Sequence, residues 1–455
     1  MSESNGLPKG WAEATLAEAC CVLLGSSPPG STYNPEGRGL PFFQGKAEFG
    51  DLYPTPVKYC DSPVTVAEKD DVLISVRAPV GPTNLCPSTS CIGRGLAVIR
   101  SLAEVPPKYV LYAIRATVAR LAEKATGTTF TAINGSQLRE HRLRLAPLPE
   151  QHRIVEKIEE LFSDLDAGVS ALKRAKANLK RYRASVLKSA VEGRLTEEWR
   201  KEHPQAEDGA FLEDNWVLLE EVITLLGQGW SPKCESAPAT DDAEWAVIKT
   251  SAIQSMVFLP DENKQLPDTL TPRPELVIEP GDLLITRAGP RTRAGVTCLV
   301  RHTRPRLILC DKAYRVRFDE TRAFPAFVEV VLNSPRFLDR LDELKTGISD
   351  SGVNLTQKKF VEMPIPLPPL AEQEQIVLLV EERLSQIDSA EKTIDAELIR
   401  AKRLRQSILK RAFEGKLVPQ DPKDEPASVL LEQIKASKDT EQPKKKTKKV
   451  KAKSK

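Results

Sequence analysis

The sequence predicts a mixed fold of α and β structure. It has two globular α/β halves, each followed by a long helix, and the two helices pair as an antiparallel coiled coil within the chain. Three observations predict this fold. The chain has 455 residues, more than one hydrophobic core usually holds. One long segment occurs twice, and both copies space their apolar residues in heptads.

The composition is that of a folded protein from a reducing compartment. Hydrophobic residues make up 40% of the chain and charged residues 28%. No apolar run reaches the roughly 18 residues that cross a bilayer, and the N-terminus lacks the pattern of a secretory signal. The eight cysteines include no CxxC pair. We therefore expect a cytoplasmic protein with no membrane segment and no metal site.

Residues 145–195 and 367–417 are two copies of one segment, because identical residues recur 222 positions apart from Leu145 to Leu417. Upstream the match is weaker and the offset drifts. Asn134 and Gln137 match Asn354 and Gln357 at an offset of 220, Asp71 matches Asp282 at 211, and Trp11 matches Trp216 at 205. The chain thus contains a globular half and a helix twice, and the globular halves have diverged more than the helices.

This organisation predicts five parts: a first globular domain at 1–149, a helix at 150–194, a second globular domain with a short entry linker at 195–368, a helix at 369–417, and a linker with a disordered tail at 418–455. Residues 444–455 carry eight lysines and no acid, and without them the net charge of +3 becomes −5. Local patches must therefore provide any polyanion binding by the body. The tail either adds non-specific DNA affinity or is solvated and without function.

Both long helices carry an apolar seam with alternating spacings of three and four residues. The predicted seam consists of Ile158, Leu165, Leu172 and Leu179 in the first helix and Val380, Ile387, Ile394 and Leu398 in the second. Each helix follows a proline-rich stretch and ends at a Glu-Gly pair, a plausible helix stop.

The charges of the helices predict how they pair. Residues 150–166 hold six acids and two bases, and 171–194 hold eight bases and one acid; the second helix has the same order. Antiparallel pairing places the acidic part of each helix beside the basic part of the other. The alternative is two independent helices, each packed on its own domain.

Each globular half combines strand-like runs, at 72–75 and 96–99 or at 283–286 and 313–316, with a late helix, at 108–124 or 325–344. Polar side chains in the loops are candidates for contacts with bases and phosphates, although any single Arg or Lys is commonly just a surface residue. The candidates are Gln44, Lys46, Arg77, Asn84, Arg94, Thr128, Thr129 and Asn134 in the first half and Lys249, Gln254, Arg287, Arg291, Arg293, Lys312 and Asn354 in the second.

Motifs for catalysis are absent from the sequence. It has no P-loop, no GxGxxG, no nucleophile elbow and no amino-methyltransferase motif, and the four histidines are scattered without ligand spacing. We expect no catalytic residue and no bound cofactor in this chain.

The repeated pattern resembles the specificity subunit of Type I restriction-modification systems. The resemblance covers about residues 7–417. It rests on the junctions PIPLPPLAEQEQIV (364–377) and LAPLPEQHRIV (145–155), the helix ends LKSAVEGRL (187–195) and LKRAFEGKL (409–417), and the strand motifs DVLISVRAPVG (71–81) and DLLITRAG (282–289).

This resemblance implies two target recognition domains, each reading one half of a split, asymmetric sequence in double-stranded DNA, with the helical pair as a spacer. It further implies two methyltransferase subunits that use S-adenosylmethionine to modify adenine, and restriction subunits that use ATP and Mg²⁺ to translocate and cleave DNA. Two other readings stay open from the residues: a coiled-coil scaffold and a self-contained DNA-modification enzyme.

Overall fold

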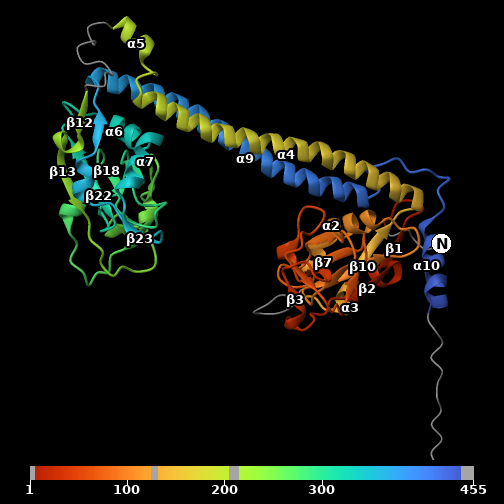
Figure 1. Ribbon diagram of the computed structural model, residues 1–455. Helices are drawn as coiled ribbons and strands as arrows, with labels where there is room; N and C mark the ends of the chain where they lie inside the picture. The colour runs from red at the N-terminus through yellow and green to blue at the C-terminus, as the bar shows by residue number, and fades with distance from the viewer. Residues whose placement is uncertain (1–5, 124–131, 204–214, 442–455) are drawn as a thin grey trace, which may run out of the picture. The chain divides into compact units, whose positions relative to one another are not determined.

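The computed structural model describes residues 6–123, 132–203 and 215–441 (Figure 1). The chain divides into two compact units. Unit 1 comprises Met1–Ala171 and Ala396–Lys455, and unit 2 comprises Leu172–Asp395. Each unit contains one globular half together with one part of each long helix. The predicted domain boundaries stay a prediction, because the division of the chain crosses both helices.

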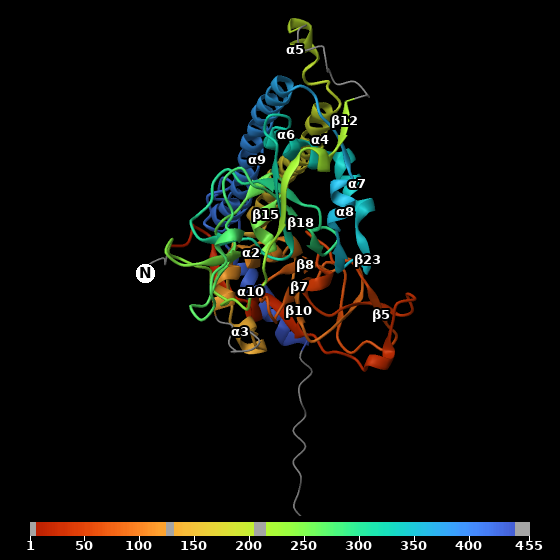
Figure 2. The same ribbon diagram turned by 90° about the vertical axis from the view of Figure 1, so that its left-hand side faces the viewer.

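The strands of unit 1 pair in three groups. Their bounds are β1 Ala12–Thr15, β2 Cys20–Leu24, β3 Tyr33–Asn34, β4 Leu40–Phe43, β5 Lys58–Cys60, β6 Val66–Ala67, β7 Val72–Ser75, β8 Thr83–Leu85, β9 Ser90–Ile92, β10 Leu96–Ser101 and β11 Arg142–Leu145. β1 pairs with β11, one sheet has the order β2-β10-β7-β8, and another has the order β3-β5-β4-β9-β6. Figure 2 labels β10, β7 and β8 of the four-stranded sheet. Only the β4–β9 pair among these ladders is parallel.

Unit 2 repeats this topology. Its strands are β12 Trp216–Leu218, β13 Ile223–Gln228, β14 Ala246–Ile248, β15 Ile253–Gln254, β16 Val257–Phe258, β17 Asn263–Gln265, β18 Leu283–Thr286, β19 Ala288–Gly289, β20 Thr297–Leu299, β21 Leu307–Ile308, β22 Ala313–Phe318, β23 Thr346–Ser349, β24 Gly352–Asn354 and β25 Pro364–Pro366. β12 pairs with β25, and β13-β22-β18-β20 matches β2-β10-β7-β8. β14 runs parallel to β21, as β4 does to β9. Three further groups are β17-β14-β21, β15-β16 and β19-β24-β23.

The predicted strands and late helices are largely confirmed. β7, β10, β18 and β22 lie where the apolar runs predicted strands. The late helix of unit 1 is α2 (Pro107–Glu123), and its Tyr109 is fully buried. The hydroxyl of Tyr109 donates to the Arg144 carbonyl at 2.9 Å and accepts from the Ala146 amide at 3.0 Å. These bonds tie α2 to the chain that enters the first long helix.

One predicted helix is wrong as a single element. Residues 325–344 form two helices, α6 (Pro325–Leu332) and α7 (Pro335–Leu344). Pro335 lacks an amide hydrogen and its ring disfavours a helical residue before it, so the chain breaks at Asn333 and Ser334. The other short helices are α1 Leu16–Ala19, α3 Gly135–Arg139, α5 Glu197–Glu202 and α8 Gln357–Val361.

The structure corrects the repeat alignment around Asn134. Asn134 is the N-cap of α3, and Thr356 is the N-cap of α8. The two caps are 222 residues apart, the offset of the long helices. The predicted match of Asn134 with Asn354 is therefore wrong by two residues, because Asn354 lies in β24 and is the backbone partner of Ala288 and Thr346.

The long helices α4 (Leu148–Val191) and α9 (Leu370–Phe413) have 44 residues each, about 66 Å at 1.5 Å per residue. Both end as predicted at a glycine in the left-handed region: φ is 69° at Gly193 and at Gly415. The Arg194 amide donates to the Ser189 carbonyl, and the Lys416 amide to the Arg411 carbonyl. This is the Schellman arrangement, which satisfies the last carbonyls of a helix.

The helices pair antiparallel within each unit, as the charges predicted. In unit 1, Asp166 of α4 forms an ion pair with Arg405 of α9. In unit 2, Asp388 of α9 forms the equivalent ion pair with Arg183 of α4, and both residues lie 222 positions from their counterparts. Lys176 and Asp395 pair at 2.5 Å in unit 2. The alternative of two independent helices is therefore wrong (Figure 1).

The predicted seam faces inward to different degrees. Ile158, Val380, Ile387 and Ile394 are buried, and Leu165, Leu172, Leu179 and Leu398 are half-buried. Near the middle of the pair, Ile387 and Ile394 of α9 are thus more buried than Leu165 and Leu172 of α4.

The repeated Glu-Gln pair at each helix start is structural. Gln151 donates to the Ala146 carbonyl at 2.8 Å, and Gln373 donates to the Pro368 carbonyl at 2.7 Å. Glu150 accepts from the Trp11 indole at 3.1 Å, and Glu372 accepts from the Thr196 hydroxyl at 2.6 Å. All four side chains are buried, so this junction motif was retained to join each helix to its domain.

The prediction of a linker and disordered tail at 418–455 missed a helix. α10 (Ala427–Glu441) packs on unit 1 and buries Leu430 and Ile434. Asp424 forms an ion pair with Arg153 at 2.6 Å just before it. Only the lysine-rich part of the tail lies outside the described residues. Among the described helices, none is long and apolar enough to span a membrane.

Candidate nucleic-acid interface

Loops of unit 1 meet at one shallow cavity. It has a volume of about 280 Å³ and is lined by Gly25, Arg77 and Arg94, among others. Gly25 follows β2 and lies so close to the next chain that a Cβ there would stand 2.1 Å from the Gly93 carbonyl oxygen. Only glycine permits this approach, which explains its place in the repeated loop. Arg77 and Arg94 are exposed at the rim.

Backbone bonds bring Gln44 to the same edge. The Val76 amide donates to the Gly95 carbonyl at 3.0 Å. A Cβ on Gly95 would lie 2.3 Å from the Gln44 carbonyl oxygen, so these chains are in direct contact. Gln44 is exposed, as is Lys46 two residues later. Three candidates from distant parts of the sequence therefore form one polar, cationic surface, which we call surface 1 (Gln44, Arg77 and Arg94).

Two other candidates of the first half have structural roles. Asn84 is 1% exposed, and its amide both donates to and accepts from the backbone of Gly50 at 3.0 Å. Its side chain is not accessible to DNA, so the prediction that Asn84 contacts DNA is wrong. Asn134 is exposed but accepts from the Gln137 amide at 2.9 Å as the cap of α3. Thr128 and Thr129 lie outside the described residues.

A cavity in unit 2, with a volume of about 220 Å³, lies beside the loop that follows β13, at a different place in the fold from the cavity of unit 1. Lys249, Lys264 and Lys312 line it, and we call these three residues surface 2. The loop after β13 lies close to the backbone of Leu309. As at Gly25 in unit 1, only glycine fits there, because a Cβ on Gly229 would lie 2.1 Å from the Leu309 carbonyl oxygen. Lys249 also pairs with Glu262 at 3.7 Å. Surface 2 thus presents three ammonium groups around one hollow.

The arginine candidates of the second half are mostly engaged within the protein. Arg293 donates to the carbonyls of Thr250 and Ile253, both at 2.6 Å, and to the Gln254 amide oxygen at 3.2 Å. Arg293 and Gln254 therefore hold the loop that carries Lys249.

The other two arginines have different partners. Arg287 donates to the Asp311 carbonyl at 2.7 Å and lies over the ring of Tyr314. Arg291 binds Asp350 at 3.0 Å and Asp342 at 2.8 Å, and these bonds raise its pKa. Asn354 is exposed on β24.

Sequence reasoning missed Lys264 as a member of surface 2. Lys264 lies on β17, whose pairing with β14 places it opposite Val247, two residues before Lys249. Strand pairing between the segments at 246–248 and 263–265 could have suggested this, because the two runs flank a turn-rich stretch. Nothing in the local sequence distinguishes Lys264 from an ordinary solvated lysine.

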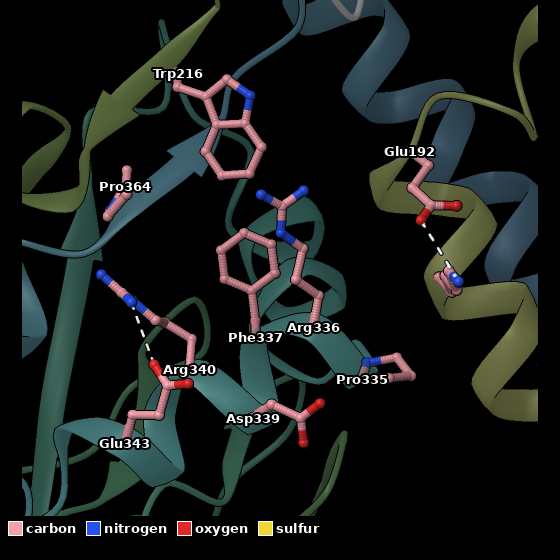
Figure 3. Close-up of a pocket in the computed structure, with 10 residues that line it drawn as sticks. Glu192, Trp216, Pro335, Arg336, Phe337, Asp339, Arg340, Glu343 and Pro364 are labelled. Atoms are coloured by element: carbon pink, nitrogen blue, oxygen red, sulfur yellow. Dashed lines mark hydrogen bonds and ion pairs between the residues drawn. The ribbon is translucent and has the colours of Figure 1, made fainter. Parts of the chain in front are cut away.

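A further cavity of unit 2 is separate from these surfaces. It has a volume of about 720 Å³ and none of the candidate residues lines it. Figure 3 shows Glu192, just after the end of α4, across this cavity from Trp216, Arg336 and Phe337. The Trp216 and Phe337 rings are stacked at 5.9 Å, and Arg336 lies 4.7 Å from the Trp216 ring centre.

Groups with perturbed pKa values do not assemble a reactive site. Burial raises the pKa of Cys20 and of Cys91 to about 12, which keeps both thiols neutral and unreactive at physiological pH. Burial also raises the pKa of Glu329, which accepts from the Leu299 amide at 2.6 Å and pairs with Arg301 at 3.0 Å. Among the described residues no group of three or more His, Cys, Asp or Glu could hold a metal ion.

Known proteins share this organisation. A family model for the Type I restriction modification DNA specificity domain matches residues 8–174. The Type I restriction enzyme EcoKI specificity subunit of Escherichia coli (strain K12) is 26% identical to the chain, over 94% of the chain and 96% of that protein. The chain is thus similar to Type I restriction enzyme specificity subunits, to one of them along most of its length.

Two further specificity subunits are more similar over shorter stretches. The putative MjaX specificity subunit of Methanocaldococcus jannaschii and the EcoEI specificity subunit of Escherichia coli are both 36% identical, over 43% and 37% of this chain. The chain spans 45% and 28% of the lengths of those two relatives. The crystal structure of the HsdS subunit from Thermoanaerobacter tengcongensis has the same fold, with a TM-score of 0.50 and 21% identity over 90% of this chain and 98% of that one.

Proposed function

We propose that this chain is a specificity subunit that reads a split, asymmetric sequence in double-stranded DNA, with surface 1 of unit 1 at one half and surface 2 of unit 2 at the other. One observation carries the proposal. The same framework, a four-stranded sheet with a close-packed glycine loop, occurs in both units, yet the cations that line the nearby cavity differ: Arg77 and Arg94 in one unit and Lys249 and Lys312 in the other. Equal frameworks with different side chains suit two different half-sites.

The chemistry of these surfaces suits nucleic acid. Arg bonds to guanine edges through two parallel N–H groups, and Gln44 can bond to adenine in a similar way. The ammonium groups of surface 2 suit phosphates, which position a protein on the duplex without reading its sequence. Surface 1 is therefore the better candidate for direct base reading, and surface 2 combines phosphate contacts with the neighbouring hydroxyls of Ser231 and Thr250.

The proposal assigns the chemistry to partner subunits. Two methyltransferase subunits would supply S-adenosylmethionine and methylate adenine, and restriction subunits would supply ATP- and Mg²⁺-dependent translocation and cleavage. This chain would be non-catalytic, bind none of these cofactors and act in the cytoplasm, with the helical pair as the spacer between half-sites. The similarity to Type I specificity subunits supports these partners, and the sequence offers no motif for the reactions.

The deciding experiment is co-expression with the methyltransferase subunit, followed by mapping of methylated adenines across the host genome by long-read sequencing. We expect one split motif with a fixed gap and one modified adenine on each strand. Methylation by the purified chain alone would contradict the proposal and favour a self-contained enzyme. A stable complex with partners but no sequence-dependent DNA binding would favour a scaffold.

A further inference from the structure

The four-stranded sheets of the two units have the same register, which identifies equivalent positions in the two halves. In unit 1, Leu24 at the end of β2 pairs with Ala97, the second residue of β10. In unit 2, Gln228 at the end of β13 pairs with Tyr314, the second residue of β22. Leu24 and Gln228 therefore occupy the same place, directly before the close-packed glycine of each unit.

A second strand pairing identifies two more equivalent positions. Arg77 forms an antiparallel backbone bridge with Ala132 in unit 1, and Ala288 pairs in the same way with Asn354 in unit 2. In both units the amide after the bridge donates to the carbonyl before it, at 3.0 Å in unit 1 and at 2.7 Å in unit 2. Arg77 thus corresponds to Ala288, and Ala132 to Asn354. We define the framework positions as these three pairs: Leu24 and Gln228, Arg77 and Ala288, and Ala132 and Asn354.

The framework positions differ in chemistry between the units, although their buried neighbours do not. Ile133 and Leu355, which follow the two bridges, are both apolar and 5% and 0% exposed. At the framework positions, unit 1 has a leucine, an arginine and an alanine, and unit 2 has an amide, an alanine and a second amide. The four larger side chains are all exposed: Leu24, Arg77, Gln228 and Asn354. The difference between the units therefore falls on side chains that a ligand can reach.

In unit 1 the framework positions border one apolar cavity. Leu24, Arg77 and Ala132 all line the cavity of about 280 Å³. Apart from Arg77 and Arg94, its lining consists of apolar residues and glycine. In the major groove, an apolar side chain can contact the methyl group of thymine, and an arginine can donate to N7 and O6 of guanine. The cavity of unit 1 suits a thymine methyl that lies close to a guanine edge.

In unit 2 the framework positions carry two free amides. Within the part of the chain that the structure describes, the side chains of Gln228 and Asn354 form no hydrogen bond. A carboxamide can accept from the N6 amino group of adenine and donate to N7 of the same base. The lysines of surface 2 cannot do this, because an ammonium group only donates. The amides therefore offer unit 2 a means of base recognition that its lysines lack.

We propose that the framework positions are the base-reading positions of both units. Leu24 reads a thymine methyl and Arg77 a guanine in one half-site, and Gln228 and Asn354 read adenines in the other. This inference rests on the proposed function and adds to it which residues select which bases. Surface 2 positions the duplex through its phosphates, and the two amides of unit 2 supply the sequence preference there.

The test removes single atoms from the DNA. It uses the full chain in complex with the methyltransferase subunit, and duplexes that carry the mapped motif with one base analogue each. Uracil in place of one thymine of the first half-site removes only the C5-methyl group, so the wild type should bind about fourfold more weakly. Leu24→Ala should bind the thymine and uracil duplexes equally. Val57→Ala, at a 68% exposed position of unit 1 outside the framework, is the control and should keep the uracil effect.

The second half-site is tested with 7-deazaadenine, which lacks the N7 acceptor. This analogue should weaken binding by the wild type about fivefold at two adenines. Gln228→Leu should abolish the effect at one of them and Asn354→Ala at the other. Arg77→Ala should likewise abolish the effect of 7-deazaguanine at one guanine of the first half-site.

Analogue effects of wild-type size in the framework variants would overturn the inference. So would a wild-type complex that is indifferent to every analogue, or framework variants that weaken all duplexes equally, since these side chains would then have no role in base selection. None of these results would affect the proposed function, because a split motif would still be read. A wild-type complex that methylates no split motif would refute the proposed function itself.

Discussion

Basic residues around the cavity of unit 2 have different roles. Some line the cavity, namely Lys249, Lys264 and Lys312, and others hold the loops in place. All three lysines line one cavity, whereas the guanidinium of the neighbouring Arg293 donates hydrogen bonds to the Thr250 and Ile253 carbonyls. Basic residues of one loop region therefore either line the cavity or support the fold, according to whether a backbone carbonyl lies within reach.

Lys312 tests the phosphate role of surface 2. Replacement of Lys312 by Gln removes one positive charge from an exposed position. We expect weaker DNA binding by the methyltransferase complex and a slope of log affinity against log salt that is smaller by about one. The methylated motif should be unchanged, because phosphate contacts carry no sequence information. Lys392→Gln, on α9, is the matched control and should leave the salt slope as it is.

Asn84 tests the opposite role. Asn84→Ala leaves the amide and carbonyl of Gly50 without their side-chain partner. We expect the free energy of unfolding to fall by about 1–3 kcal/mol, the typical result of unpairing buried polar groups. Chemical denaturation measures this loss. A changed recognition sequence with unchanged stability would return Asn84 to the DNA-contact candidates.

Glu150 links one residue to the pH dependence of stability. Burial raises its pKa, although the Trp11 indole partly opposes the shift. The folded state therefore favours the protonated form, so this group's contribution to stability is greatest at low pH and falls as the pH rises through its folded pKa. Glu150→Gln keeps an acceptor for Trp11 but cannot ionise. Unfolding curves from pH 4 to 7 should show a smaller loss of stability with rising pH in the variant than in the wild type.

At the scale of the element, the ion pairs and the seam of the helical pair have different roles. Asp166–Arg405 and Asp388–Arg183 are exposed pairs, so they select the antiparallel orientation more than they stabilise it. The apolar seam stabilises the pair. Burial of that seam is uneven near its middle, where Leu172 is half-buried and Ile394 is buried.

Leu172 and Ile394 test the seam. Leu172→Asp with Ile394→Asp places two carboxylates in the apolar interface, where desolvation and mutual repulsion oppose pairing. We expect a lower free energy of unfolding and loss of sequence-specific methylation. Ala177→Asp with Thr393→Asp, at exposed positions of the same helices, is the control. Unchanged specific methylation in the seam variant would mean that reading a split target does not require the pair.

At the scale of the whole molecule, the duplicated topology predicts modular reading. Replacement of residues 1–149 by the corresponding domain of another family member should change one half of the methylated motif and leave the other half and the gap unchanged. The measurement is again genome-wide mapping of methylated adenines. Changes in both halves would show that the two units do not read DNA independently.

The architecture was largely predictable because it rests on repetition and periodicity. A 222-residue offset and heptads are visible without coordinates, and the same order of acidic and then basic residues in both helices leaves antiparallel pairing as the favourable orientation. The strands at 72–75 and 283–286 were equally visible as buried apolar runs. α10 was not predicted, because its apolar residues are few. Only their packing in the hydrophobic core of unit 1 shows that this segment is a helix.

The candidate site could be predicted only by residue type. Gln44, Arg77 and Arg94 lie far apart in the sequence, and strand pairing and close glycine contacts bring them together. Asn84 and Arg293 are polar in the same way as these three residues, but they donate hydrogen bonds to backbone carbonyls of the protein. Whether a polar side chain does so depends on neighbours that are distant in the sequence. Periodicity along the chain therefore determined the organisation of this protein. Tertiary structure alone decided which polar groups are free for DNA, because hydrogen-bond partners are set in space.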